Sequence, residues 1–307
     1  MEGSMSEYPL HLEAFKQMNY MSTAANNVHP TSRLRLFLQT AFYLQSTLSD
    51  TTLNTQTGIP WPSNDSGYSK EFTETSNLNC AIDDHVLQHT YGITHRLVVG
   101  VRSITILFWH RLYYENQSQA LPAELVGVIS TIRKHVRAWD VTMEQDLLSF
   151  DEKSEGGLMK QVRDLHLCAF HHAIQIYLLT HLPQTSCESI LPASEDVQFH
   201  VDQVAASLLQ IEKLKYESRL LSGQRTASIM WPGFIAACES SPNSRKIWCR
   251  WWSHMLDYNI GNIELLWQTV QDIWHFSDEV ESTKRIPHNI PLWRVFLAQA
   301  ERTILPL

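Results

Sequence analysis

The residue types best suited to bind a metal ion lie in the run Asp83-Asp84-His85-Val-Leu-Gln-His89. His85 and His89 are four residues apart, so on a helix both imidazoles share one face, which is the spacing that two zinc ligands need. No glutamate stands between them in the HExxH position, and no third ligand can be nominated. Exposed or partly buried helix histidines explain the pattern without a metal. We therefore predict no metal and no cofactor; if the chain is an enzyme, Asp84, His85 and His89 are its acid–base candidates.

A second group of reactive residue types lies at His166, Cys168, His171 and His172. Cys168 and His172 form an i, i+4 pair, and a cysteine beside a histidine can supply a thiolate nucleophile. Asp164 continues the same row, but it lies on the far side of Cys168 from the histidine that it would have to orient. A buried cysteine beside a packing histidine is therefore the simpler interpretation.

Residues 228–252 hold four of the chain's 10 tryptophans. Two stripes at helical spacing run through this segment, joined by the residues SSPNS, and they comprise Met230, Phe234, Ala237 and Cys238, then Ile247, Trp251 and Met255. A helical hairpin whose aromatic faces fill a core explains most of these side chains. A pocket for a small molecule is the alternative, because such pockets are lined mainly by aromatic groups with a few polar ones.

The elements that would position these residues are helices. Leu125, Ile129, Ile132, Val136 and Trp139 are spaced 4, 3, 4 and 3 residues apart, which predicts a helix over 122–139 that begins near Pro122. Similar patterns predict helices over 34–48, 83–114, 158–181, 197–211, 244–256, 263–274 and 291–304. Residues 50–79 are rich in Thr, Ser and Asn, which predicts an irregular segment. The fold class predicted for 1–307 is one all-α domain of packed antiparallel helices.

The composition argues against several classes of partner. A net charge of −8 gives no electrostatic reason to bind nucleic acid or an anionic membrane. Five cysteines without a CxxC pair fit a reducing compartment, and neither a signal peptide nor a membrane-spanning run is visible. The basic residues Arg133, Lys134, His135 and Arg137 are expected on the solvated face of their helix. We therefore expect an intracellular protein.

The aromatic segment and the residues C-terminal to it resemble the C-terminal half of fungal zinc-cluster transcription factors. The resemblance is carried by the run Met230-Trp-Pro-Gly-Phe-Ile-Ala-Ala-Cys-Glu239, by Arg245 and Gly261-Asn262, and by Val270-Gln-Asp-Ile-Trp274. It is strongest over 160–280 and weaker over 80–150. The resemblance implies an all-α regulatory domain that receives effectors or coactivators, with these motifs as structural anchors. The six-cysteine zinc cluster that binds DNA in that family is absent from this chain, whose first cysteine is Cys80.

We therefore expect a regulatory domain of a fungal transcription regulator that binds a hydrophobic small molecule or a coregulator protein, acts in the nucleus and does not itself contact nucleic acid or membrane. The alternatives are a cytoplasmic biosynthetic enzyme that acts on a hydrophobic secondary metabolite, and an interaction module that forms a homodimer. A pocket is expected between the helices near 97–114, 165–179 and 227–252. The predicted ligand-binding residues are Arg102, Trp109, His110, His172, Phe234, Trp248 and Trp251.

Overall fold

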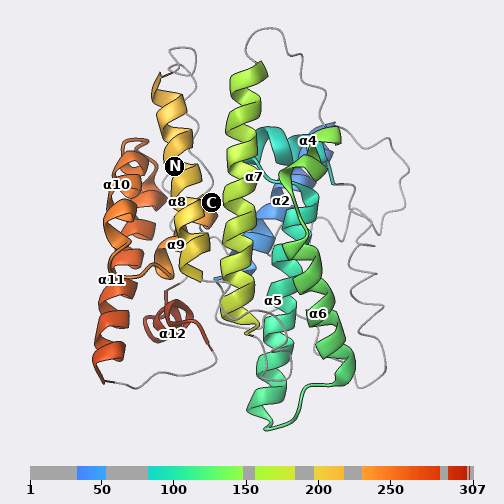
Figure 1. Cartoon of the computed structure of the whole chain (residues 1–307), viewed down its shortest axis with the longest axis vertical. Helices are drawn as coiled ribbons and strands as arrows, with labels where there is room; N and C mark the ends of the chain where they lie inside the picture. Colours follow the sequence, from blue (N-terminus) through green and yellow to red (C-terminus); the bar gives the residue numbers. More distant parts are fainter. Residues whose placement is uncertain are drawn as a thin grey trace.

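The computed structural model describes residues 33–52, 82–147, 156–183, 197–217, 230–283, 290–302 and 304. Every regular element in these ranges is helical, which confirms the all-α fold class (Figure 1). In chain order the elements are α2 (Arg33–Asp50), α4 (Asp84–Val86), η2 (Leu87–Tyr91), α5 (His95–Asn116), α6 (Ala123–Arg137), η3 (Val141–Leu147), α7 (Gly156–His181), α8 (Val197–Glu217), α9 (Trp231–Cys238), α10 (Arg245–Leu256), α11 (Gly261–Thr283) and α12 (Leu292–Gln299).

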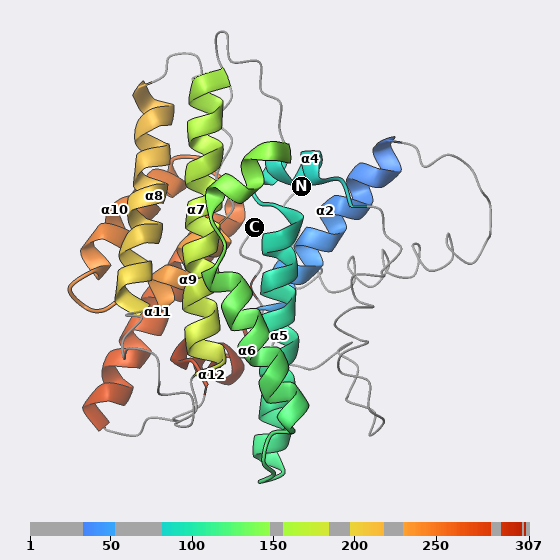
Figure 2. The same cartoon turned by 45° about the vertical axis from the view of Figure 1, so that its right-hand side comes forward.

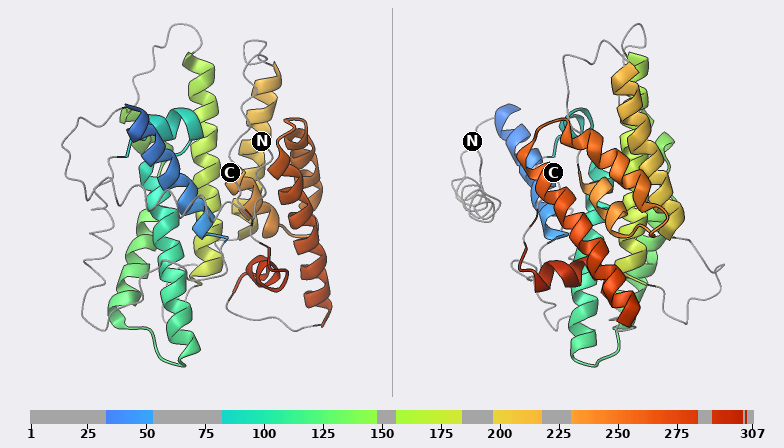
Figure 3. Two further views of the ribbon diagram at one scale, coloured as in Figure 1. Left: turned by 180° about the vertical axis from the view of Figure 1, so that it is seen from behind. Right: turned by 90° about the vertical axis from the view of Figure 1, so that its left-hand side faces the viewer.

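Helix α7 lies in the middle of the molecule. It packs against α5 and α6 on one side and against α8 and α9 on the other, and α2 leans on α5 (Figures 1 and 2). Helices α10 and α11 form the outer layer beyond α8 and α9, as the views from behind and from the side show (Figure 3). Helix α12 packs on α11 and reaches α7 through Arg294, which donates to His181 and to the Tyr177 hydroxyl. Buried apolar side chains form one cluster that runs from Tyr43 on α2 to Ile304 near the C-terminus.

The predicted helix over 83–114 is wrong, because the structure divides it in two. Asp83 caps the short α4 by accepting the backbone N–H groups of His85 and Val86. A π-helical turn follows and ends at Gly92, whose φ of 63° lies in the left-handed region that favours glycine. Thr94 then caps the start of α5 by accepting the backbone N–H of Leu97. A glycine followed closely by a capping residue therefore ends one helix and starts the next.

The tryptophan-rich segment forms two helices, α9 and α10, as predicted. Trp231 and Trp274 are core residues, which confirms their predicted burial; the indole N–H of Trp231 donates to Thr51 Oγ1 at 2.9 Å and that of Trp274 donates to the Ala237 carbonyl at 2.7 Å. The predicted stripe on α10 is wrong at Ile247, which is exposed. The buried face of α10, which packs against α8 and α11, comprises Trp248, Trp251, Trp252 and Met255.

The boundaries of α2, α6, α7 and α10 agree with the predicted ones to within two residues, whereas α8 extends to Glu217 and α11 to Thr283, six and nine residues beyond the predicted ends. Helix α12 ends at Gln299, five residues before the predicted end at Ile304. In the predicted irregular segment 50–79, Asp50 is the last residue of α2 and 51–52 form a turn, while 53–79 lie outside the described residues. In the described part of the chain, no helix is both long and apolar enough to cross a membrane.

One predicted solvent-exposed basic residue is buried instead. Arg133 is 4% exposed, and its guanidinium donates to the carbonyl of Leu182 just beyond the end of α7. Lys134 and His135 are exposed, as predicted. The expectation for Arg133 was wrong because α6 packs against α7, which turns this position away from solvent.

Candidate functional site

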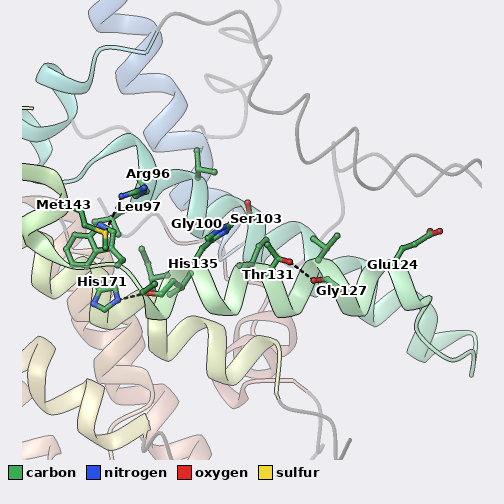
Figure 4. Close-up of a pocket in the computed structure, with 17 residues that line it drawn as sticks. Arg96, Leu97, Gly100, Ser103, Glu124, Gly127, Thr131, His135, Met143 and His171 are labelled. Atoms are coloured by element: carbon green, nitrogen blue, oxygen red, sulfur yellow. Dashed lines mark hydrogen bonds between the residues drawn. The ribbon is translucent and has the colours of Figure 1, made fainter. Parts of the chain in front are cut away.

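A furrow of about 980 Å³ lies between α5, α6, η3 and α7. Its walls are mainly apolar, and the larger apolar side chains that line it are Leu97, Val99, Val128, Ile132, Val136, Trp139, Met143 and Ile174. Polar groups are spread along its length, with Arg96 and His171 at one end and Glu124 at the other (Figure 4). A mainly apolar cleft with a few separated polar groups has the composition of a binding site.

Two glycines in helix interiors open this furrow. Gly100 lies within α5 and Gly127 within α6, where glycine destabilises a helix by roughly 0.5–1 kcal/mol relative to alanine. A Cβ atom at Gly127 would meet nothing within 4 Å, and one at Gly100 would meet only Ile174 Cγ2, at 4.0 Å. Packing inside the chain therefore does not require either glycine. The missing side chains instead leave space in the furrow on both of its long walls.

Arg96 places a loosely held positive charge at one end of the furrow. The carboxylate of Glu144, which is 3% exposed, accepts the indole N–H of Trp139 at 2.8 Å. Arg96 Nη1 is 3.9 Å from the same oxygen, and the Arg96 side chain is 63% exposed. Because Glu144 is already held by Trp139, and because an exposed ion pair at this distance contributes little, the Arg96 guanidinium is available to another anion.

His171 joins the end of α6 to α7 at the floor of the furrow. Its Nε2 lies 2.9 Å from the Val136 carbonyl, which can only accept, so Nε2 carries the hydrogen and donates. The side-chain amide of Gln175 donates to the same carbonyl at 3.2 Å. The ring of Trp139 lies against the His171 ring, with centroids 4.6 Å apart. Burial lowers the pKa of His171, so this contact holds a neutral imidazole at pH 7.

All seven predicted ligand-binding residues lie outside this furrow. Arg102 on α5 lies over the ring of Tyr43, at 5.9 Å from its centroid, and therefore faces α2. Trp109 lies near the Arg294 guanidinium, and His110 is buried on the same helix α5. The predicted pocket boundaries agree with the furrow at α5 and α7, but α6 and η3 form its remaining walls in place of α9 and α10.

The other four predicted residues are spread over three helices. His172 on α7 faces His200 on α8, with their Nδ1 atoms 2.9 Å apart. Phe234 on α9 packs edge-on against Trp293. Trp248 and Trp251 on α10 are fully buried, with ring centroids 5.9 Å apart. The structure does not bring the seven residues together in one site, and ligand binding by them stays a prediction.

The acid–base candidates lie near the start of the α4–α5 region. Asp84 Oδ1 accepts the backbone N–H of His95 at 2.9 Å, so this carboxylate helps to hold the start of α5. His85 is exposed, and the side chain of His89 lies outside the described residues. Among the side chains that the structure describes, no group of three or more His, Cys, Asp or Glu is placed to hold a metal ion. The enzymatic alternative stays a prediction.

The geometry around Cys168 favours the packing interpretation over a thiolate nucleophile. Burial raises the pKa of the Cys168 thiol, and the negative charges of Asp164 and Asp140 raise it further. Burial lowers the pKa of His172 to about 4, and the neighbouring histidines His171 and His200 lower it too. The thiol and the imidazole are therefore both neutral at pH 7, whereas a catalytic pair needs a thiolate.

Burial disfavours the charged form of five histidines on α5 and α7, including His171 and His172. Their pKa values are all lowered, chiefly because burial disfavours the charged imidazolium, and the set comprises His110, His166 (to about 3), His171, His172 (to about 4) and His181. His181 shows how such a neutral ring is used: its Nδ1 lies 2.9 Å from the Tyr177 carbonyl and its Nε2 accepts Arg294 Nε–H at 2.7 Å. A buried cation and a buried histidine can share this hydrogen bond only while the histidine is neutral.

Sequence reasoning missed the furrow residues, although one signal for them was present. Gly100 and Gly127 fall in the middle of predicted helices, where a glycine that neither caps nor kinks the helix calls for a packing or functional reason. Arg96, Met143 and His135 carried no pattern that distinguishes them from ordinary surface residues. Their common position depends on how α5, α6 and η3 pack.

The fold and the furrow together define an all-α chain with an open, mainly apolar furrow on its surface. The family model described as Fungal specific transcription factor domain matches residues 1–305. The chain belongs to this family, which confirms the resemblance carried by the Trp-Pro-Gly-Phe segment and the helices C-terminal to it. No curated protein and no solved structure matched the chain.

Proposed function

We propose that this chain is the regulatory domain of a fungal transcription regulator, and that the furrow between α5, α6, η3 and α7 receives its effector, a hydrophobic small molecule or a coregulator protein. Membership of the fungal transcription factor domain family supports the regulatory role. The observation that carries the location is the pair Gly100 and Gly127, which leave space on both walls of a mainly apolar furrow where packing inside the chain does not require it.

The net charge of −8 supports a division of labour in which DNA contacts come from another module or another chain. The domain would then act in the nucleus by responding to its effector. A regulatory domain needs a surface to which an effector can bind and from which it can dissociate. An open furrow provides such a surface, whereas the aromatic core around α9 and α10 is closed to solvent.

A reporter assay tests this proposal. Residues 1–307 are fused to an unrelated DNA-binding domain and tested on a reporter gene in a fungal host, beside the variant Gly127→Leu, whose side chain projects into the furrow. The matched control is Gly157→Leu on α7, another position where an added Cβ meets nothing within 4 Å. We expect the wild-type fusion and the control to change reporter output equally, and Gly127→Leu to lose most of that change at equal protein level.

The proposal is contradicted if the wild-type fusion leaves the reporter unchanged, or if Gly127→Leu and Gly157→Leu behave alike while both remain folded by circular dichroism. Incubating the purified chain with apolar candidate effectors adds a second readout: a regulator returns its effector unchanged, whereas an enzyme converts it.

A further inference from the structure

We propose that the occupant of the furrow is an amphipathic α-helix of a partner protein, bound with its C-terminal end toward Arg96 and its N-terminal end toward Glu124. This inference rests on the proposed function, because it uses the same furrow, and it specifies which kind of effector fits there. Four features of the structure carry it: the length of the furrow, its open side, its small side chains and the charges at its two ends.

The furrow has the length and form of a helix-binding groove. On α5 its wall includes Arg96, Val99, Gly100 and Ser103, and on α6 it includes Gly127, Thr131, His135 and Ala138, so each wall is a face of one helix at helical spacing. From Glu124 to Ala138 the α6 wall extends for about 21 Å at about 1.5 Å per residue. On α5 the lining residues extend only from Arg96 to Ser103, about 10.5 Å, so both walls flank about two turns of a partner helix and α6 alone flanks about two more.

The open side of the furrow favours a helix over a small molecule. Gly127, Thr131 and His135 on the α6 wall are all exposed to solvent, as are Val99 and Met143, whose exposed fractions are 38% and 50%. A small molecule in this space would keep much of its surface in water, whereas typical small-molecule pockets bury about 70–90% of their ligand. An amphipathic helix buries one face and leaves the other in solvent, which matches an open furrow.

Small side chains along the furrow allow the backbone of another helix to approach closely. Gly100 and Ser103 on α5 are one turn apart, as are Gly127 and Thr131 on α6. Side chains at i, i+3 or i+4, and i+7 of an incoming helix could therefore enter between the two walls and contact Val128, Ile132 and Leu97. Larger residues at the two glycines would hold such a helix away.

The charges at the two ends set the direction of the helix. Arg96 lies near the start of α5 and Glu124 near the start of α6; because these two helices run in opposite directions, Arg96 and Glu124 mark opposite ends of the furrow (Figure 4). An α-helix carries about half a negative charge at its C-terminus and about half a positive charge at its N-terminus. Glu144 and Asp140 keep their negative charges near this end, but their carboxylate oxygens accept from Trp139 and Thr142. The Arg96 side chain, in contrast, is 63% exposed, so its guanidinium can donate directly to the terminal carbonyls of a partner helix. Arg96 therefore favours the C-terminal end of the partner.

Two 16-residue peptides test the proposal. Both carry leucine at 3- and 4-residue spacing on one face and are locked as helices by a side-chain lactam, so that their helicity is equal by circular dichroism. One has acidic residues in its last turn and lysines in its first turn, and the other has the reverse. Each is labelled with fluorescein, and binding to residues 1–307 is measured by fluorescence polarisation.

We expect the peptide with an acidic C-terminal turn to bind saturably and at least tenfold more tightly than the reversed peptide. Gly127→Leu should weaken its binding at least tenfold, whereas Gly157→Leu and Arg250→Glu, at an exposed position on α10, should leave it unchanged. The double variant Arg96→Glu, Glu124→Arg should prefer the reversed peptide. This inversion is a result that a loss of folding cannot produce.

Equal affinity for the two peptides, or binding that Gly127→Leu does not change, overturns the proposal. The small-molecule occupant has its own signature: 1-anilinonaphthalene-8-sulfonate binds one to one and is lost on Gly127→Leu, while neither peptide binds. That result overturns the helix but leaves the proposed function standing. A concentration-dependent dimer that Gly127→Leu dissociates would identify a second copy of this chain as the occupant. That result would overturn the proposal that the helix comes from a partner protein.

Discussion

Replacing glycine by alanine at positions 233 and 127 should have opposite effects on stability. Both residues lie within helices, Gly233 in α9 and Gly127 in α6. A Cβ atom at Gly127 would meet nothing within 4 Å. A Cβ atom at Gly233 would overlap Cη2 and Cζ3 of the Trp251 ring and lie 3.1 Å from Cζ2. The same chemical change is therefore unopposed at one position and blocked at the other.

Two opposing effects set the expected magnitudes. Gly→Ala in a helix gains up to about 1 kcal/mol, because alanine restricts the unfolded chain and favours the helix. At Gly127 this gain stands alone, so Gly127→Ala should stabilise the domain by about 0.5–1 kcal/mol. At Gly233 overpacking costs about 1–3 kcal/mol or more. Trp251 is fully buried between Trp248 and Trp252, with ring centroids 5.9 and 5.0 Å away, so its ring cannot move aside cheaply.

Urea unfolding followed by circular dichroism at 222 nm measures both variants without depending on tryptophan fluorescence. We expect Gly233→Ala to lower the free energy of unfolding by about 1–2 kcal/mol, and so to differ from Gly127→Ala by about 1.5–3 kcal/mol. In a double-mutant cycle with Trp251→Leu, the cost of Gly233→Ala should largely disappear, because the ring atoms that it meets are gone.

An increase in stability on Gly233→Ala, or a cost that persists unchanged in the Trp251→Leu background, would refute the contact between these two residues. It would also remove the reason for a glycine in the Trp-Pro-Gly-Phe run. Destabilisation by Gly127→Ala would contradict the finding that nothing inside the chain fills the space beside α6.

Three further predictions concern the core, the pH dependence and nucleic acid. Trp231→Ala and Trp274→Ala should each lower the free energy of unfolding by roughly 3–5 kcal/mol, the usual cost of emptying a large aromatic site, and an unchanged urea midpoint would contradict the packing around α9 and α11. Lowering the pH from 7 to 5 should reduce stability by about 2–5 kcal/mol, because His166 and His172, whose pKa values burial lowers to about 3 and about 4, bind protons between pH 6.5 and 5 only when unfolded, at about 1.4 kcal/mol per proton and pH unit. The lowered pKa values of His110, His171 and His181 act in the same direction. Glu239 opposes this trend, because burial raises the pKa of its carboxyl to about 7 and the stabilisation from the protonated carboxyl is lost as the pH rises from 4.5 to 7. A urea midpoint that is higher at pH 5 than at pH 7 would refute the expectation that the histidines outweigh Glu239. Residues 1–307 should form no sequence-dependent complex with DNA in a gel shift at low salt, because the chain carries a net charge of −8.

Local spacing was enough to predict where most of the longer helices lie. The repeat from Leu125 to Trp139 predicted α6, and the aromatic stripes predicted α9 and α10, because a 3.6-residue period places apolar side chains on one face whatever that face later contacts. The break at Gly92 was also present in the sequence, as a glycine followed by a capping threonine. The apolar pattern continues on both sides of it, however, and therefore predicted one long helix in place of two.

Spacing does not say which faces of which helices meet, and the tertiary structure alone decided that. The sequence predicted that Arg133 is exposed to solvent, whereas in the structure the packing of α6 on α7 places its guanidinium at the Leu182 carbonyl. Gly233 and Trp251 are 18 residues apart, and no local rule relates a glycine in one helix to a ring on the next. The furrow is the clearest case: Arg96, Gly100, Gly127 and Met143 come from three elements, and they share a surface only because helix packing left the space between those elements unfilled.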